Sequence, residues 1–323
     1  MEKKHSTNGI DLLKFILSLL VVLIHCNPIK NDNCYKFLIE GIIRIAVPSF
    51  FLINGLLLKE QYLLNKSLYL KKNIKIYLFW SLLYFPFYYH TSISTYCLNF
   101  VMGYGHLWYI GAMILGVFLF SFIYKSRLNN VLLYIFIYAV ACFSFYYIQI
   151  ISEDIDHNIV AKILKLPKYL IRNGFWDALP FIGIGYMIKR KRFTIKQSYN
   201  LVLFLLSITA LLFESYVLRI KFFNIYESTE GADFMFMLLP TSVFLLLYFK
   251  DHIKLGINSI LFRRLSALVF FIHYGVNQIL MEISQYGAVE RTFITIAITM
   301  VISLIVIYIQ DTIHESKRCT KPV

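Results

Sequence analysis

Ten apolar segments, each close to the length that crosses a lipid bilayer, follow one another along this chain of 323 residues. They cover approximately 10–27, 36–58, 75–92, 106–124, 130–150, 169–188, 198–217, 233–249, 266–284 and 292–310. A spanning helix needs about 20 apolar residues, and backbone groups in lipid must be hydrogen-bonded internally. With 59% hydrophobic residues and a mean hydropathy of +0.65, an ordinary soluble domain is excluded. We predict an all-α, polytopic integral membrane helical bundle with about ten transmembrane helices.

Basic residues are distributed unevenly between the connecting segments. Most of the 32 lysines and arginines fall in alternate segments, most densely in 189–192, whereas the intervening segments 152–156 and 227–230 are acidic and carry none. Because positive residues are retained on the cytoplasmic side, this pattern predicts that both termini are cytoplasmic. The net charge of +14 is then a signal of topology, and we expect no nucleic-acid partner.

The chain is expected to form one transmembrane domain over residues 1–323 without an appended soluble domain or a cleaved signal peptide. Its five cysteines are scattered with no C-x-x-C spacing, so we expect no metal site.

Ionisable residues interrupt the first apolar segment. Lys14 and His25 are eleven residues apart, which is close to three helical turns, so both side chains return to one face roughly 16 Å apart along the axis. Asp11 falls near the same face. Such residues are costly in a span and usually face a polar interior, so this face is a predicted functional site. Lys14 alternatively snorkels to the interface, and Asp11 either pairs with Lys14 or caps the helix.

The second segment carries Arg44 in a position too deep to snorkel easily, which predicts a paired side chain or a wet cavity. Pro48 is expected to kink this helix and to free a backbone carbonyl. Asn54 is equally consistent with a place in the wall of an active site and with an interhelical hydrogen bond.

Five strings, in this order along the chain, carry a resemblance to a known family. They are G-I-D-x-x-K at 9–14 followed by His25, R-I-A-V-P-S-F-F-L-I-N-G at 44–55, H-L-W-Y-I at 106–110, R-N-G at 172–174 and F-I-H at 271–273. The chain resembles the membrane acyltransferase-3 family and is similar to the membrane half of the vancomycin-resistance serine racemases. The family pattern has arginine where Lys14 stands; lysine is a compact point charge without the planar fork of arginine.

The resemblance implies roles for individual residues. His25 would be the catalytic base, because a sugar hydroxyl needs a base to attack a thioester. The donor-binding residues would be Asp11, Lys14, Arg44 and His273, the last lying roughly 10 Å deep on the donor side rather than beside His25. The acceptor-binding residues would be His106, Trp108, Arg172 and Asn173. An aromatic interfacial belt is the alternative for His106 and Trp108, and a lipid-headgroup contact is the alternative for Arg172 and Asn173.

The function expected from the resemblance is membrane O-acylation, specifically O-acetylation. An acyl group would pass from cytoplasmic acetyl-CoA, or another acyl-CoA, to a hydroxyl of a cell-surface or lipid-linked polysaccharide at the bacterial plasma membrane. Acyl-CoA would be a co-substrate and no bound cofactor is expected; the partners are the donor, the glycan and membrane lipid. The alternative function is transport or export of a small amino acid or a glycan intermediate.

Overall fold

The computed structural model describes residues 8–28, 41–88, 92–154, 173–221, 234–255, 259–283 and 285–319, and all regular structure in these residues is helical. Within these described ranges, five helices are long and apolar enough to cross a membrane: Asn8–Cys26, Gly105–Ile123, Gln197–Leu218, Ile260–Ile283 and Ala288–Ile313. Shorter apolar helices cover Gly41–Leu57, Ile93–Met102 and Val131–Tyr146. The helical, multi-pass membrane character is confirmed, whereas ten crossings and cytoplasmic termini stay predictions.

The chain divides into two compact units. Unit 1 joins the two ends of the chain, Met1–Asp32 and Ile253–Val323, and unit 2 is Asn33–His252.

In the part of unit 1 that the structure describes there are three helices, α1 (Asn8–Cys26), α13 (Ile260–Ile283) and α14 (Ala288–Cys319). α1 packs against both α13 and α14. The centre of this packing is apolar: Val22 and Cys26 of α1 meet Val269 of α13, and Ile296 and Met300 of α14 lie against them. A further apolar side chain, that of Leu19, completes the cluster.

The buried side of α14 also carries small hydroxyl residues at helical spacing, namely Thr292, Thr295, Thr299 and Ser303. Thr292 and Thr295 donate to backbone carbonyls one turn earlier, Ala288 and Arg291, each at 2.7 Å. Small residues that satisfy their own hydroxyls let membrane helices approach closely.

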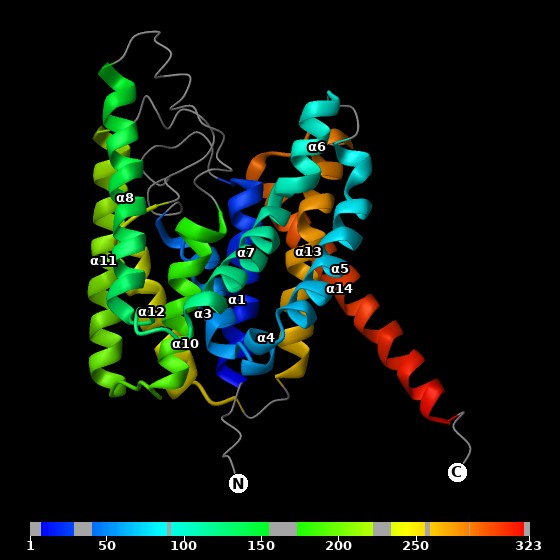
Figure 1. Ribbon diagram of the computed structural model, residues 1–323. Helices are drawn as coiled ribbons and strands as arrows, with labels where there is room; N and C mark the ends of the chain where they lie inside the picture. The colour runs from blue at the N-terminus through cyan, green and yellow to red at the C-terminus, as the bar shows by residue number, and fades with distance from the viewer. Residues whose placement is uncertain are drawn as a thin grey trace. The chain divides into compact units, whose positions relative to one another are not determined.

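Unit 2 contains the remaining described helices. In chain order they are α3 (Ala46–Leu57), α4 (Glu60–Leu64), α5 (Lys66–Leu83), the 3₁₀ helix η1 (Phe85–Phe87), α6 (Ile93–Met102), the 3₁₀ helix η2 (Gly105–Leu107), α7 (Trp108–Ile123), α8 (Val131–Asp154), the π-helix η4 (Gly174–Ala178), α10 (Leu179–Arg190), α11 (Gln197–Lys221) and α12 (Leu238–His252). α11 and α12 lie side by side (Figure 1).

The third apolar segment differs most from its predicted bounds. Its helix α5 begins at Lys66 and ends at Leu83, whereas hydropathy predicted 75–92. Pro86, within η1, explains the early end, because proline disfavours helical geometry in the residue before it and cannot donate to the preceding turn. Lysines 71, 72 and 75 therefore lie on the helix and not in a connecting segment.

In unit 2, α3 and α10 approach each other closely through two glycines. A β-carbon on Gly55 would meet the carbonyl oxygen of Ile182, and one on Gly185 would meet the carbonyl oxygen of Leu52. Backbone thus lies directly against backbone, an approach that only glycine permits.

We expect Gly55→Ala or Gly185→Ala to lower the free energy of unfolding by about 1–3 kcal/mol, because the added methyl group overpacks a backbone contact. Unfolding of the purified protein in detergent measures this change. Gly111→Ala is the matched control: a β-carbon there has no atom within 4 Å. Equal destabilisation by all three substitutions would contradict the packing explanation.

Candidate active site

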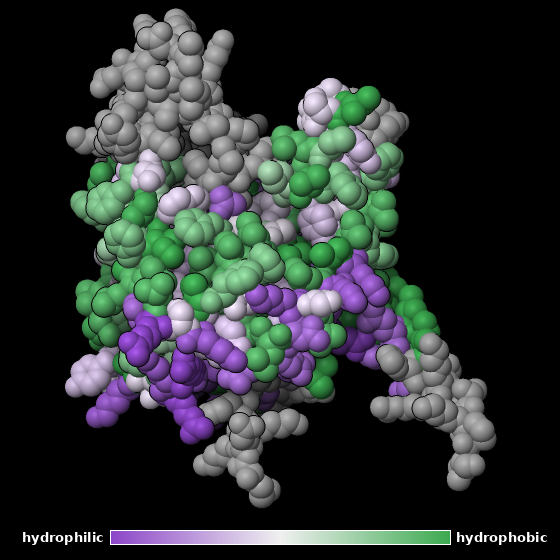
Figure 2. All heavy atoms as spheres, viewed as in Figure 1, coloured by the Kyte–Doolittle hydropathy of each residue, from purple (hydrophilic) through white to green (hydrophobic). Residues whose placement is uncertain are grey.

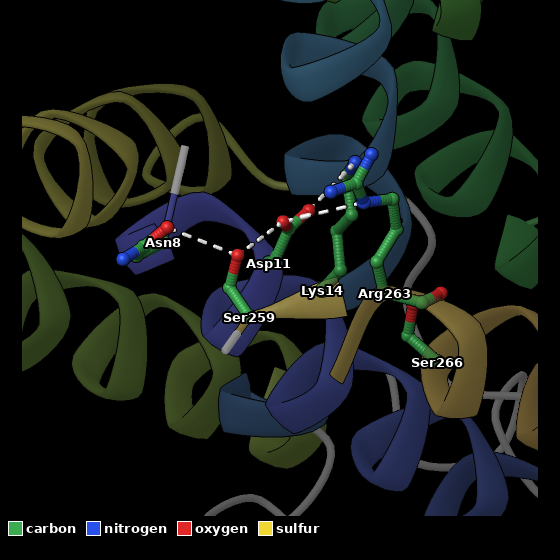
Figure 3. A network of polar contacts seen from close by, with 6 residues as sticks. All are labelled: Asn8, Asp11, Lys14, Ser259, Arg263 and Ser266. Carbon is green, nitrogen blue, oxygen red and sulfur yellow. Dashed lines mark hydrogen bonds and ion pairs between the residues drawn. The ribbon is translucent and has the colours of Figure 1, made fainter. Parts of the chain in front are cut away.

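Asp11 is the centre of a charged cluster between α1 and the start of α13 (Figure 3). The carboxylate is buried, with the residue 2% exposed. Lys14 Nζ lies 3.6 Å from its Oδ1 and Arg263 Nε lies 3.3 Å from its Oδ2. Pairing of Asp11 with Lys14 is therefore confirmed, and Lys14, whose side chain is 17% exposed, is held by its neighbour on the helix. Arg263 was not predicted by the sequence analysis.

Two further polar residues connect α1 to the segment before α13. The Ser259 hydroxyl lies 3.0 Å from both Asp11 Oδ2 and Asn8 Oδ1, and its single hydrogen donates to one of them at a time. Asn8 Nδ2 donates to the Leu255 carbonyl at 3.1 Å. A buried carboxylate must be paired or hydrogen-bonded to be tolerated, and here both kinds of partner are present.

His25 lies beside His273, at a ring-centroid distance of 5.3 Å. The prediction that His273 lies apart from His25 is wrong. α13 begins at Ile260, six residues before the predicted start, so His273 lies about 20 Å along its helix and reaches the level of His25. The Tyr274 ring also meets the His25 ring, edge to face at 5.1 Å.

The two histidines differ in environment. His273 is fully buried and its Nδ1 lies 2.9 Å from the Val269 carbonyl oxygen. Because a carbonyl only accepts, Nδ1 of His273 carries the hydrogen, and in the neutral ring the lone pair lies on Nε2. His25 is partly exposed. Of the two rings, His25 is the one that a substrate can reach.

Side chains from both neighbouring helices bind the last carbonyls of α1. Asn277 Nδ2 donates to the His25 carbonyl and Arg291 Nη2 to the Cys26 carbonyl, each at 3.2 Å. The last carbonyls of a helix lack partners within it and favour a positive neighbour. These contacts fix the end of α1 that carries His25. Asn277 was not predicted, although it follows His273 by one helical turn.

In unit 2, Arg44 lies at a turn, residues 44–45, that separates helical residues 41–43 from α3. The expected effect of Pro48 explains this interruption: proline has no N–H to donate to the Arg44 carbonyl. Arg44 is partly buried. Asn54 donates to the Tyr109 hydroxyl of α7 at 2.5 Å. The predicted interhelical hydrogen bond of Asn54 is therefore confirmed.

The predicted acceptor residues that the structure describes lie on two segments that pack together. His106, in η2, is buried and its ring meets the Tyr84 ring edge to face at 5.2 Å. Trp108 is the first residue of α7, which packs against η4. Asn173 directly precedes η4, and its Oδ1 accepts from the backbone N–H of Phe175 at 2.8 Å. Asn173 is therefore a helix cap. Arg172 lies outside the described residues.

The basic cluster 189–192 ends α10 and borders a pocket of about 440 Å³. The pocket is lined by Glu60, Leu64, Tyr124, Lys125, Tyr186 and Arg190. Lys189 donates to the Leu58 carbonyl at 2.6 Å and so ties α10 to the end of α3. Figure 2 shows hydrophilic side chains gathered where α10 ends, beside a hydrophobic band.

Glu214 is a second, partly buried carboxylate that accepts several hydrogen bonds. It accepts from the Tyr146 hydroxyl and from the backbone N–H groups of Phe236 at 2.8 Å and Met237 at 2.9 Å. Phe236 and Met237 lie just before α12, and Tyr146 lies on α8. Glu214, on α11, therefore joins α8 to the start of α12. In the described residues no group of three or more histidines, cysteines or carboxylates gathers in a way that would hold a metal ion.

The sequence model of the acyltransferase-3 family, an acyltransferase domain, matches residues 7–309. The chain belongs to this family. The match extends over both units, so the helices that carry His25 and His273 and those that carry His106 and Asn173 all lie within the family domain.

Curated relatives of this acyltransferase-3 protein include racemases. The chain is 27% identical to an amino-acid racemase of Enterococcus faecalis over 98% of its own length and 48% of that protein. It is 25% identical to a serine/alanine racemase of Enterococcus gallinarum, over 74% of the chain and 36% of that protein. The chain thus spans about half the length of the relatives it matches, or less. No solved structure matches it significantly.

We expect Asp11→Asn to destabilise the acyltransferase-3 protein by about 3–5 kcal/mol, because removing the carboxylate leaves Lys14 and Arg263 without a counter-charge. Thermal unfolding in detergent measures the change. Asp311→Asn is the matched control, since Asp311 is an exposed carboxylate that pairs with Arg264 at 2.7 Å. Exposed pairs contribute about 0–1 kcal/mol, so a loss at Asp11 no larger than that at Asp311 would contradict the assignment.

Proposed function

We propose that this protein is a bacterial plasma-membrane O-acyltransferase, most simply an O-acetyltransferase, that moves an acyl group from a cytoplasmic acyl-CoA to a hydroxyl of a surface or lipid-linked polysaccharide. Membership of the acyltransferase-3 family supports acyl transfer. The observation that carries the assignment of the site is the His25–His273 pair, with a partly exposed histidine held against a buried one.

In this proposal His25 is the general base. It takes the proton from the acceptor hydroxyl while the hydroxyl oxygen attacks the thioester carbonyl carbon. The new carbon–oxygen bond forms, the carbon–sulfur bond breaks, and the CoA thiolate leaves and takes up a proton. The Asn277 and Arg291 contacts to the end of α1 support this role, because a base must be held within hydrogen-bond reach of the hydroxyl.

The Asp11 cluster is proposed to bind the anionic part of the donor. Lys14 precedes His25 by roughly 16 Å along α1, a separation suited to an elongated thioester whose phosphates and acyl group lie at opposite ends. Arg44 is proposed as a donor-binding residue from the family resemblance.

The acceptor is proposed to bind near η2 and the start of α7, where His106 and Trp108 lie, and at Asn173, which precedes η4. Arg172 is proposed as a further acceptor residue from the family resemblance. Sugars pack on aromatic faces while polar groups bind their hydroxyls. The hydrogen bond that Asn173 accepts from Phe175 caps η4 and holds this side chain in place.

A second function, transport of a small amino acid or glycan intermediate, is favoured by one observation. The chain aligns with 48% of a protein named as an amino-acid racemase and with 36% of one named as a serine/alanine racemase. A part shared with these proteins would serve a small amino acid. Transport moves its substrate without covalent change. The two functions therefore differ in whether an acylated product appears.

We expect His25→Ala to abolish acylation of the surface polysaccharide at unchanged protein level, because the hydroxyl would lack its base. Mass spectrometry of the glycan from cells with and without the protein measures the acyl mass difference. His252→Ala is the control: this histidine ends α12 and its Nε2 contacts the Ile195 carbonyl at 3.1 Å. An acyl signal in the His25→Ala strain equal to that of the wild type would refute the mechanism. A wild-type glycan without acyl groups would favour transport.

A further inference from the structure

We propose that Arg263 is a second anion-binding residue of the donor site and that Asp11 positions it. This inference rests on the proposed function, because it names the group that the site binds: a phosphate-bearing part of the acyl donor. The donor-binding residues expected from the family resemblance were Asp11, Lys14, Arg44 and His273, without Arg263. The structure adds a guanidinium from another helix against the same carboxylate.

The charges of the cluster do not cancel. Asp11 supplies one negative charge, whereas Lys14 and Arg263 supply two positive charges within 3.6 Å and 3.3 Å of it. The hydroxyl of Ser259 adds a neutral donor. One cation would neutralise the buried carboxylate, so the cluster keeps one surplus positive charge, and an anion brought to it gains a favourable interaction.

Arg263 is the cation that can reach a ligand. Its Nε is the atom that pairs with Asp11, and its side chain is 52% exposed. Among the described residues Asp11 is its one ion-pair partner. The two terminal nitrogens of a guanidinium held at Nε form a fork that binds two phosphate oxygens at once. Lys14 lies deeper and adds a point charge beside this fork.

The register of α1 and α13 supports the same ligand. The two helices run parallel, since Asp11 meets Arg263 near their starts and His25 meets His273 further along. Lys14 to His25 is roughly 16 Å along α1, and Arg263 to His273 is roughly 15 Å along α13. Each helix therefore presents a cation and then a histidine at nearly the same spacing. One elongated molecule with phosphate at one end and a reactive carbonyl at the other would contact both pairs.

Arg264, the next residue of α13, has a structural role. Arg264 binds α14 through Asp311 Oδ1 at 2.7 Å, Gln310 Oε1 at 3.0 Å and the Ile307 carbonyl at 3.2 Å. Arg264 therefore joins two helices. It has the same charge and nearly the same position along α13 as Arg263, which makes it the matched control.

The test uses the purified full-length protein in lipid nanodiscs, with free coenzyme A as a binding probe and acetyl-CoA as substrate. We expect Arg263→Gln to weaken coenzyme A binding and to raise KM for acetyl-CoA by about tenfold, with kcat changed less than about threefold, because a bidentate charged contact is lost remote from the reacting atoms. Arg264→Gln is expected to shift both values less than about twofold. The double variant Lys14→Arg with Arg263→Gln returns a fork to the same carboxylate and is expected to recover part of the loss.

Equal effects of Arg263→Gln and Arg264→Gln on coenzyme A binding would overturn the proposal. Both arginines would then contribute only general positive charge and not a specific contact to the phosphate. So would unchanged KM in Arg263→Gln. If that variant unfolds, Arg263→Lys decides, because it keeps the charge on Asp11 and loses the fork; unchanged binding in it would overturn the proposal. Binding of coenzyme A needs no turnover, so these outcomes are distinct from failure of the glycan to become acylated.

Discussion

The buried carboxylate of Asp11 determines much of the arrangement of unit 1. A lone carboxylate on an apolar helix would be too costly to bury, and its partners come from both α1 and the start of α13. Because Lys14 lies on its own helix and Arg263 on the neighbouring one, the same carboxylate closes a local ion pair and joins two segments far apart in sequence. Sliding α13 by one turn along α1 would separate Arg263 from Asp11 by about 5 Å.

That register is what brings the histidines together. The apolar cluster of Val22, Cys26 and Val269 would tolerate small shifts, since hydrophobic contact is not directional. Polar contacts at both ends of α1 are directional. Asp11 fixes the beginning, and Asn277 with Arg291 fixes the carbonyls at the end. His25 is therefore held against His273 by polar contacts to two other helices.

Much of this arrangement follows from hydropathy and helical spacing, and the errors have identifiable causes. The common face of Asp11 and Lys14 was predicted because helical periodicity alone determines it. Arg263 and the depth of His273 were missed for one reason. A hydropathy window starts a span where polar residues end, so Arg263 and Arg264 moved the predicted start to residue 266, although the helix begins at Ile260. Arg263, the partner of Asp11 on α13, lies in that excluded segment. The π-helix η4 had no signal in the sequence, because its geometry depends on packing against α7.

The same contacts thus serve folding and the proposed chemistry. In lipid a polar side chain gains little by facing outward, so a helix that needs ionisable groups must be matched by a neighbour with complementary ones. α1 and α13 make two such polar contacts: the ion pair of Asp11 with Arg263 and the contact between the rings of His25 and His273. An excess of one positive charge has a cost that binding an anion removes. A donor whose phosphate neutralises the cluster would for this reason stabilise the folded state, while its acyl group reacts at His25. Ligand-dependent stability follows from affinity for the folded form alone.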